Sequence, residues 1–413
     1  MKRSMIVFLI CLFPIISFSQ KPAEYFSFPA EFEKHDAIWM GWRTTTTRGI
    51  DKSETLLRII KSLTPYIKVN LFVDHDSTIE TLQKEFRKIG INKNRVQMFV
   101  FPNPYSNVRD PGPVFLRSNK GNLMIADMKW SFYGEAPGNS SAAKRIDSID
   151  WYVARKLNLP VRTSTLISEG GAREFNGKGV MMAVESTEMH RNKGWSRDSI
   201  EKELLRMFGQ EKIIWLKKAL AEDDPLKYEL PSGTLYTFGI NHIDEFCRFA
   251  SSNTILLAEV TKDESLKDTL HKISYERLQE NIRILKSVTD QNGKPFKVLR
   301  VPAAEMMTRT YRINSNDTAS IKKFNLAATG GDVTYYIATS YLNFLVTNGI
   351  VLMASYWKPG RPDIIRQKDN AAKNIIQLAF PGRKIIQINV EVLNQGMGGI
   401  HCATQQQPAV IKP

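Results

Sequence analysis

Cysteine is scarce in this sequence, with only Cys11, Cys247 and Cys402 among 413 residues. So few thiols exclude a disulfide-rich scaffold, and none of them shows the paired spacing of a structural zinc site. The HExxH pattern of zinc hydrolases is missing as well. We therefore expect no metal site in this protein.

Two further absences concern the organisation of the chain. Beyond residue 20, no apolar run approaches the roughly 20 residues that a membrane-spanning helix needs. Between residues 25 and 413 there is no stretch rich in proline, glycine and serine that would serve as a linker. Because a hydrophobic content of 42% is ample for a buried core, one continuous domain is expected.

Lysine and arginine outnumber aspartate and glutamate by 57 to 42, which gives a formal net charge of +15. Such a balance is typical of proteins with nucleic acid or acidic surfaces as partners. The basic residues are scattered, however, and no run of them is interleaved with aromatic residues. We expect solvated faces and no nucleic-acid partner.

The N-terminus has the parts of a secretory signal. Lysine and arginine follow the first methionine, and an apolar run over residues 5–16 precedes small residues around Ser19. This pattern predicts a signal peptide at residues 1–19, cleaved near Ser19. Residues 20–413 would then be a single exported domain, periplasmic or secreted, with no membrane attachment; the rival is an uncleaved membrane anchor.

A repeated pattern runs through the chain. The stretches FASSNTILLAEV from Phe249 and FLVTNGIVLMASY from Phe344 share phenylalanine, asparagine four residues on, isoleucine two further and leucine two further. Looser copies begin at Phe115 and Phe175, and each stretch is typical of a β-hairpin. Between the hairpins we expect helices, each followed by a strand. These pairs are 54–63 with 68–73, 78–89 with 95–101, 200–208 with 212–216, 275–288 with 296–301, and 370–379 with 384–390.

Hairpins that alternate with helices predict an internally repeated α/β fold. Asp110 lies five residues before Phe115, and Asp244 lies five before Phe249. The repeat thus aims two carboxylates at one centre, where they would repel each other unless a cation lay between them. This arrangement predicts a positively charged ligand. The alternative is that each aspartate is an ordinary turn or surface residue.

A cysteine and a histidine far apart in sequence are typical of covalent catalysis by a thiolate. In an extended strand His242 would share a face with Asp244, and Cys247 would point the opposite way. His401 adjoins Cys402, so on an extended chain it points away from the thiol, and His242 is the better candidate base. Two alternatives stay open: a disulfide between Cys247 and Cys402, and a merely flexible GMGG loop before Cys402.

At these residues the chain resembles the agmatine deiminase and bacterial, Porphyromonas-type, peptidylarginine deiminase family of the guanidino-group-modifying (pentein) superfamily, and it is closer to the agmatine type. The matching stretches are PAEFEKHDAIWMGW at 29–42, RDPGP at 109–113, EGG at 169–171, HIDEFCRF at 242–249, YLNFLVTNG at 341–349 and GGIHCATQQQP at 398–408. The resemblance implies a five-bladed, pseudo-symmetric α/β propeller.

The same resemblance implies the roles of individual residues. Cys402 would be the nucleophile and His242 the general acid and base. Asp110 and Asp244 would bind a guanidinium group. Glu169 matches a glutamate of the agmatine-type pocket, and Asn343 matches an asparagine near the reacting group. No metal or organic cofactor is implied.

The expected reaction is hydrolytic deimination through a covalent thiouronium adduct on cysteine, which releases ammonia and a ureido product. The substrate would be a small-molecule or peptide guanidine: agmatine, giving N-carbamoylputrescine, or a related compound. The alternatives are a secreted peptidylarginine deiminase, an amidinotransferase and a non-catalytic module that binds cationic ligands. Whether the protein is a homo-oligomer is left open.

The chain departs from the agmatine-type pattern in four places. Asn107 stands where the family carries tryptophan, and DMKWSFYG at 127–134 replaces DWxFNxWG. Both changes affect residues expected to line the pocket for the aliphatic part of the substrate. The segments 216–242 and 303–341 look longer than is usual in the family. Long segments beside an active site act as lids or specificity loops, or they are surface decoration.

Overall fold

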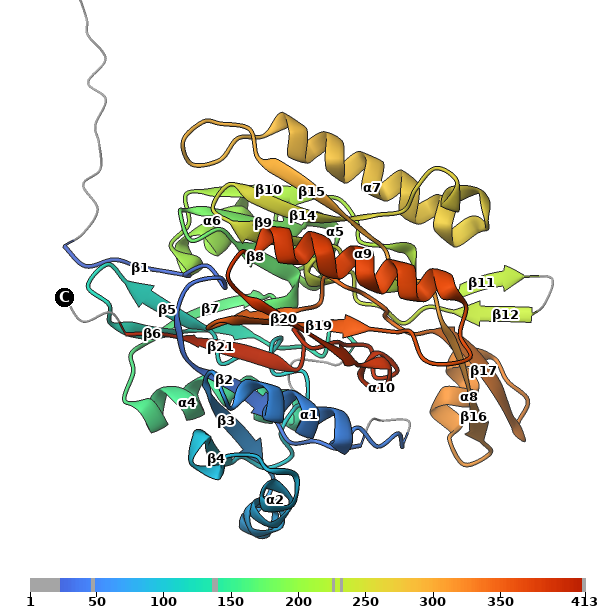
Figure 1. The fold of residues 1–413 in the computed structure, drawn as a ribbon, viewed down its shortest axis with the longest axis horizontal. Coiled ribbons are helices and arrows are strands. Elements are labelled where there is room, and N and C mark those ends of the chain that lie inside the picture. The colour runs from blue at the N-terminus through green and yellow to red at the C-terminus, as the bar shows by residue number, and fades with distance from the viewer. Residues whose placement is uncertain (1–22, 46–48, 136–139, 225–226, 231–232, 411–413) are drawn as a thin grey trace, which may run out of the picture.

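The computed structural model describes residues 23–45, 49–135, 140–224, 227–230 and 233–410. Within these residues, one structural unit occurs five times around a ring. Each unit is an antiparallel pair of strands whose inner strand also pairs in parallel with a third strand. Four units follow in sequence, and the fifth is built from both ends of the chain (Figure 1). The five-bladed, pseudo-symmetric propeller of the pentein fold is therefore present.

The strands of the four sequential units are β5 (Phe115–Ser118), β6 (Leu123–Lys129) and β7 (Val161–Ile167); β8 (Arg173–Phe175), β9 (Val180–Val184) and β10 (Lys212–Leu216); β13 (Cys247–Ser251), β14 (Thr254–Glu259) and β15 (Lys297–Pro302); and β18 (Leu345–Thr347), β19 (Ile350–Ser355) and β20 (Lys384–Asn389). All four predicted hairpins are confirmed as the first two strands of a unit. In β18–β19 the turn contains Gly349 at φ 73°, a left-handed conformation that glycine adopts without strain.

The fifth unit closes the ring. The last strand, β21 (Thr404–Pro408), pairs antiparallel with β2 (His35–Gly41). In turn, β2 pairs in parallel with β3 (Lys68–Val73), which pairs in parallel with β4 (Val96–Val100). A short strand, β1 (Phe26–Ser27), extends the neighbouring unit by pairing with β5. Residues more than 360 apart in sequence therefore lie side by side.

Helices cover the outside of the ring, with α7 and α2 at opposite edges in Figure 1. They form because apolar residues recur at helical spacing: Leu56, Ile59, Ile60 and Leu63 make the buried face of α1. Their bounds are α1 (Ser53–Leu63), α2 (Asp76–Ile89), α3 (Ser141–Asp147), α4 (Ile149–Leu157), α5 (Glu185–Arg191), α6 (Arg197–Phe208), α7 (Thr269–Ser287), α9 (Asp363–Ala379) and α10 (Glu391–Asn394). All five predicted pairs of helix and strand are confirmed.

Several helices begin earlier than the sequence pattern predicts. Apolar spacing placed the start of α7 at residue 275, whereas the helix begins at Thr269. The carboxylate of Asp268 accepts the backbone N–H of His271, which caps the first turn. The first turn of α7 mixes the polar residues Thr269, His271 and Lys272 with a single apolar one, Leu270, so the apolar pattern is weak there.

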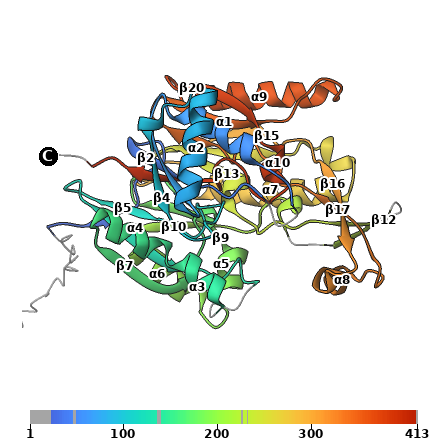
Figure 2. The ribbon, with the colours of Figure 1, turned by 90° about the horizontal axis from the view of Figure 1, so that it is seen from below.

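The two long segments fold together as one unit. Strands β11 (Lys227–Leu230) and β12 (Gly233–Tyr236) come from the first, and β16 (Thr308–Asn314), α8 (Thr318–Phe324) and β17 (Gly330–Tyr336) come from the second. A parallel pairing of β12 with β17 joins them into one four-stranded sheet. We call residues 227–230, 233–238 and 308–336 the insert module. Figures 1 and 2 show that it projects from one side of the ring.

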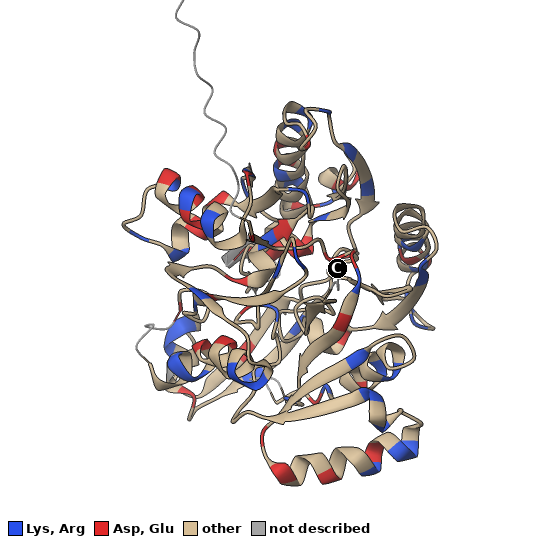
Figure 3. Ribbon diagram, turned by 90° about the vertical axis from the view of Figure 1, so that its left-hand side faces the viewer, with Lys and Arg blue, Asp and Glu red and all other residues tan. Residues whose placement is uncertain are grey.

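Two observations bear on the earlier expectations about charge and membranes. Acidic and basic residues alternate along the same helices, as Figure 3 shows. None of the helices formed by the described residues combines the length and hydrophobicity needed to cross a bilayer. The predicted signal peptide, residues 1–19, lies outside the described residues.

Candidate active site

The predicted site residues come from loops that occupy the same place in successive units. Each of the five units contributes at least one residue from the segment just before its first strand. Because those strands surround the axis of the ring, the loops converge at its centre. The contributions are Asp110 before β5, Glu169 before β8, His242 and Asp244 before β13, Asn343 before β18 and Cys402 before β21.

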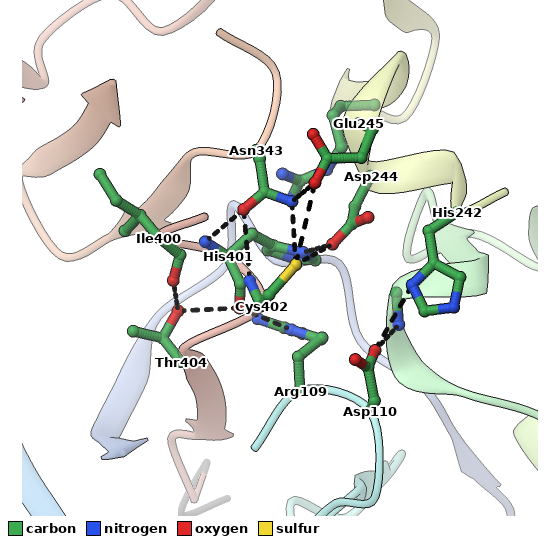
Figure 4. Close-up of polar contacts among 12 residues, drawn as sticks. Arg109, Asp110, His242, Asp244, Glu245, Asn343, Ile400, His401, Cys402 and Thr404 are labelled. Carbon is green, nitrogen blue, oxygen red and sulfur yellow. Dashed lines mark hydrogen bonds and ion pairs between the residues drawn. The ribbon is translucent and has the colours of Figure 1, made fainter. Parts of the chain in front are cut away.

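Pseudo-symmetry therefore builds the site, and the sequence spacing of Asp110 and Asp244 was one sign of it. All six predicted residues are at most 3% exposed. Figure 4 shows Cys402 and Asn343 on one side of the centre and His242 on the other, with Asp244 between them. A reacting group bound at the centre would be out of contact with bulk water.

The Cys402 thiol is held by Asn343. The amide Nδ2 of Asn343 donates to Sγ at 3.1 Å and to Oε1 of Glu245 at 2.9 Å. Its Oδ1 accepts the backbone N–H of His401 at 3.0 Å and that of Cys402 at 3.3 Å. One side chain thus fixes both the sulfur and the backbone that carries it.

Burial, followed by the negative charges of Asp244 and Glu245, raises the pKa of the Cys402 thiol well above its usual 9.0. The Sγ atom lies 3.5 Å from Oδ2 of Asp244. Burial and the neighbouring Asp244 also raise the pKa of Glu245 well above its usual range. Without a bound cation, the sulfur is therefore a thiol rather than a thiolate.

The carboxylates of Asp110 and Asp244 face the same small space. Oδ1 of Asp110 accepts the backbone N–H of Gly171 at 3.0 Å. A side-chain carbon on Gly171 would lie 2.4 Å from Nδ1 of His242, 2.9 Å from Oδ1 of Asp110 and 3.1 Å from Oδ2 of Asp244. Gly171 thus marks the point at which the three side chains converge, and only a glycine leaves room for them.

His242 is surrounded by negative charge. Its Nδ1 lies 3.6 Å from Asp110 and its Nε2 lies 3.6 Å from Glu169. Burial opposes ionisation, but Asp110, Glu169 and Asp244 outweigh it and raise the pKa of His242 to about 9. At neutral pH the ring is therefore an imidazolium that can give up a proton.

Glu169 is a firmly ionised carboxylate of the site. The Nε atom of Arg191 donates to its Oε1 at 2.7 Å. Burial acts to raise its pKa, but the neighbouring His242 and the charge of Arg191 lower it to about 2. Oε2 of Glu169, Oδ1 of Asp244 and both ring nitrogens of His242 are buried without a hydrogen-bond partner among the described residues. A polar ligand would give them partners.

Among the described residues, two sets of side chains are close enough to ligate a metal. In the first, Asp244, Glu245 and Cys402 surround the same space that the other site residues face. In the second, Glu31, Glu174 and His401 lie below it, where buried Arg109 and Arg248 already pair with these carboxylates. Because those arginines neutralise the second set, it is poorly suited to a cation.

Three sequence expectations need correction. His242 is not in a strand: residues Ile243–Glu245 form a 3-10 turn, and β13 begins only at Cys247. His242 and Asp244 share the site because this turn and the loop before it face the centre, not because strand residues alternate. The disulfide alternative is wrong, since Cys247 and Cys402 are both free and Cys247 is packed in the core against Met182.

The GMGG loop, which the sequence left open as merely flexible, packs closely against two asparagine side chains. A side-chain carbon on Gly398 would lie 2.8 Å from the amide of Asn107, and one on Gly399 would lie 2.4 Å from Oδ1 of Asn343. These glycines therefore make room for two asparagine side chains rather than for a ligand directly. Met397 adopts a left-handed conformation at φ 61°, so the loop is strained rather than simply flexible.

Sequence reasoning missed a buried ionic network beneath the site. Glu31 accepts from Nη1 of Arg109 at 2.6 Å and from Nη2 of Arg248 at 2.7 Å. It also lies 2.9 Å from Nε2 of His401, whose Nδ1 lies 2.7 Å from Oδ2 of Asp244. His401 does not hydrogen-bond to the Cys402 side chain; it links Asp244 to Glu31. The available signal was position: both arginines and His401 lie within four residues of a predicted site residue.

Tyr133 is a second residue that the sequence did not single out. Its hydroxyl donates to Oδ2 of Asp110 at 2.8 Å and accepts from the hydroxyl of Tyr105 at 3.2 Å. Both Phe132 and Tyr133 have positive φ, at 48° and 61°. The stretch DMKWSFYG, in which the chain departs from the family pattern, thus places a phenol in direct contact with the site.

Comparison with known proteins agrees with this architecture. The agmatine deiminase of Ectopseudomonas mendocina is 26% identical over 94% of this chain and 96% of its own length. That of Medicago truncatula is 26% identical over 93% and 97%. The solved agmatine deiminase of Enterococcus faecalis superposes with a TM-score of 0.70 at 22% identity, over 94% of this chain and 96% of its own. The profile of the Porphyromonas-type peptidyl-arginine deiminase family matches residues 27–408, and the chain therefore belongs to that family.

Proposed function

We propose that this protein hydrolyses a guanidino group to a ureido group through a covalent intermediate on Cys402. The observation that carries the proposal is a closed site in which two buried carboxylates, Asp110 and Asp244, and a thiol face one small space. A guanidinium is planar and cationic, and its paired N–H groups suit two-point contacts with carboxylates. The family and its agmatine deiminase members support the same chemistry.

Binding of the cation would activate the nucleophile. A guanidinium between Asp110 and Asp244 offsets the negative charge that raises the pKa of the Cys402 thiol. As the cation binds, the thiol loses its proton to solvent, and the ammonia released later takes up an equivalent proton as ammonium. The thiolate attacks the central carbon of the guanidinium, and a carbon–sulfur bond forms.

His242 would act next as the general acid. The imidazolium gives a proton to one nitrogen of the tetrahedral adduct, the carbon–nitrogen bond breaks, and ammonia leaves. A thiouronium cation remains on Cys402. The neutral imidazole then takes a proton from water, and the hydroxide adds to the same carbon. The carbon–sulfur bond breaks to release the ureido product, and the hydroxyl proton of the adduct passes to the departing thiolate, which becomes a thiol again. Glu169 supports both steps because it favours the charged form of His242.

The test is turnover with chemical trapping. Agmatine and other simple guanidines are incubated with the protein, and the amounts of ammonia and ureido product are measured. The two products should form in equal amounts. Cys402→Ala should abolish both, and mass spectrometry of quenched protein should find the thiouronium on Cys402. If no guanidine is consumed, or if Cys402→Ala matches the unaltered protein, the proposal fails.

We further propose that the protein acts outside the cytoplasm, on the strength of the apolar segment at residues 5–16 and the small residues around Ser19. Expression of the full chain in a bacterial host, with N-terminal sequencing of the periplasmic fraction, tests this. A mature protein that starts near Gln20 is expected. A full-length chain retained in the cytoplasm contradicts it.

A further inference from the structure

A cavity of about 790 Å³ lies between the catalytic centre and the insert module. We call it the vestibule. Its floor includes Tyr105, Asn107, Tyr133 and Met397. Tyr133 also touches the catalytic centre, since its hydroxyl donates to Asp110 and its ring centroid lies 5.8 Å from that of His242. One side chain therefore separates the vestibule from the guanidinium site.

The vestibule is too large for a guanidino group alone. Cavities of about 300–1,000 Å³ hold ligands of drug size, and the guanidino group itself would lie beneath the floor, at Asp110. The volume is therefore available to the part of the substrate that extends beyond the guanidine.

The insert module supplies the opposite wall, which is aromatic. Tyr236, Phe238, Tyr311 and Phe324 all line the vestibule. Their rings support one another: Tyr236 and Phe238 are stacked with centroids 6.0 Å apart, and Phe324 packs edge-on to both at 4.9 and 5.6 Å. Tyr335 backs Phe238 and Tyr311 at 5.3 and 5.6 Å. A wall of packed rings offers flat, apolar contact area.

The charged residues that line the vestibule already have polar partners. Lys323 lies 3.6 Å from Glu135, and both are exposed. Arg312 lies 3.3 Å from Asp332, and the carboxylate of Asp317 accepts the backbone N–H of Ser320 at the start of α8. The four charged lining residues, Glu135, Arg312, Asp317 and Lys323, sum to zero. The lining therefore has no surplus charge that would select a distal ammonium or carboxylate.

From this geometry we infer that the vestibule is a binding site for an uncharged, planar group, such as an aromatic ring, joined to the guanidine by a short aliphatic linker. The guanidine lies at Asp110 and Asp244, the linker passes Tyr133, and the planar group stacks on the insert module. The two sequence insertions act as a specificity wall. This inference rests on the proposed function for the position of the guanidine, but the wall can be tested by binding alone.

The experiment compares three probes that differ only at the end distant from the guanidine. Agmatine carries an ammonium there, N-acetylagmatine a small neutral amide, and N-benzoylagmatine a neutral planar ring. Their dissociation constants are measured by calorimetry with Cys402→Ala protein, and kcat/KM is measured with the unaltered protein. N-benzoylagmatine should bind about tenfold more tightly than N-acetylagmatine, which is what one well-packed aromatic contact contributes.

The wall is tested in the Cys402→Ala background with Tyr311→Ala and with the milder Phe238→Leu. Each should remove most of the preference for the benzoyl probe while leaving the affinity for agmatine within about twofold. The matched control is Tyr336→Ala, since Tyr336 lies on β17 next to Tyr335 and points to the other face of the sheet; it should retain the preference.

The outcomes separate the two proposals. If no probe is turned over but the benzoyl preference is present and depends on Tyr311 and Phe238, the proposed function fails and the vestibule assignment stands. If the three probes bind equally, or if the wall variants weaken all of them by the same factor, the vestibule assignment is overturned whatever the turnover. A preference for agmatine over both neutral probes overturns it as well.

Discussion

Replacement of Glu31 by glutamine should destabilise the protein strongly although Glu31 is not expected to touch substrate. The Glu31 carboxylate bonds to Arg109, Arg248 and His401 at 2.6 to 2.9 Å, and its side chain is only 10% exposed. Glutamine retains the shape and one acceptor oxygen but removes the charge. The two buried arginines, Arg109 and Arg248, would then have one negatively charged partner fewer between them.

The expected loss follows from the cost of leaving a buried charge without its partner. Breaking a buried ion pair costs about 3–5 kcal/mol, whereas the whole stability of a folded domain is typically about 5–15 kcal/mol. We expect Glu31→Gln to lower the free energy of unfolding by about 3 kcal/mol or more. The measurement is urea unfolding, with a lower midpoint and an unchanged slope.

Glu33→Gln is the matched control, because it makes the same change two residues away. Glu33 pairs with Arg117 but is 30% exposed, and partly exposed pairs contribute at most about 1 kcal/mol. If Glu31→Gln and Glu33→Gln shift the urea midpoint equally, the reasoning about the buried network is refuted.

The pH dependence of the same comparison gives a second check. Burial acts to raise the pKa of Glu31, but Arg109, His401 and Arg248 outweigh it and hold the pKa well below the usual 4.5. A carboxyl group whose pKa is lowered on folding stabilises the protein above its unfolded pKa and loses that effect as the pH falls. The difference in free energy of unfolding between the unaltered protein and Glu31→Gln should be largest above pH 4.5 and should decrease below it.

Three further predictions concern the site itself. Gly171→Ala should reduce kcat about 100-fold or more and lower the free energy of unfolding by about 1–3 kcal/mol, because the new carbon displaces His242 in a closely packed site; a kcat within threefold of that of the unaltered protein would contradict the predicted clash. Tyr133→Phe should raise KM about fivefold with little change in kcat, since one hydrogen bond to Asp110 is lost; an unchanged KM would show that the hydroxyl is dispensable. Alkylation of Cys402 by iodoacetamide without substrate should be slow at pH 7 and rise about tenfold per pH unit towards pH 9, because only the thiolate reacts and burial and Asp244 raise the thiol pKa; a flat profile would refute the thiol assignment.

The repeated fold could be predicted from sequence because its signals are local. Hairpins and amphipathic helices depend on residues within about ten positions of one another, and the spacing from Phe249 and Phe344 repeats such a pattern. The pairing of β2 with β21 could not be predicted in this way, because it joins residues more than 360 apart. The insert module could not be predicted for the same reason, because its paired strands β12 and β17 are about 100 residues apart in sequence.

Part of the site could be predicted from the sequence. The equal distances of Asp110 and Asp244 from the phenylalanines that follow them are visible in sequence, and the family resemblance added Glu169 and Asn343. Glu31 and Tyr133 have no such signal, because their importance comes from burial and from partners on other units. The strand proposed for His242 and Asp244 was wrong because a 3-10 turn also directs both residues to one side, and sequence spacing does not separate the two geometries.

The closure of the ring by β21 has a consequence for when the protein can act. The thiol that we propose as the nucleophile lies two residues before this strand, and its position depends on pairing with β2 at the other end of the fold. Asp110, Glu169, His242 and Asn343 can all be present on a growing chain without a nucleophile among them. If the proposed mechanism holds, activity reports the completion of folding: the chain is inert until β21 docks on β2.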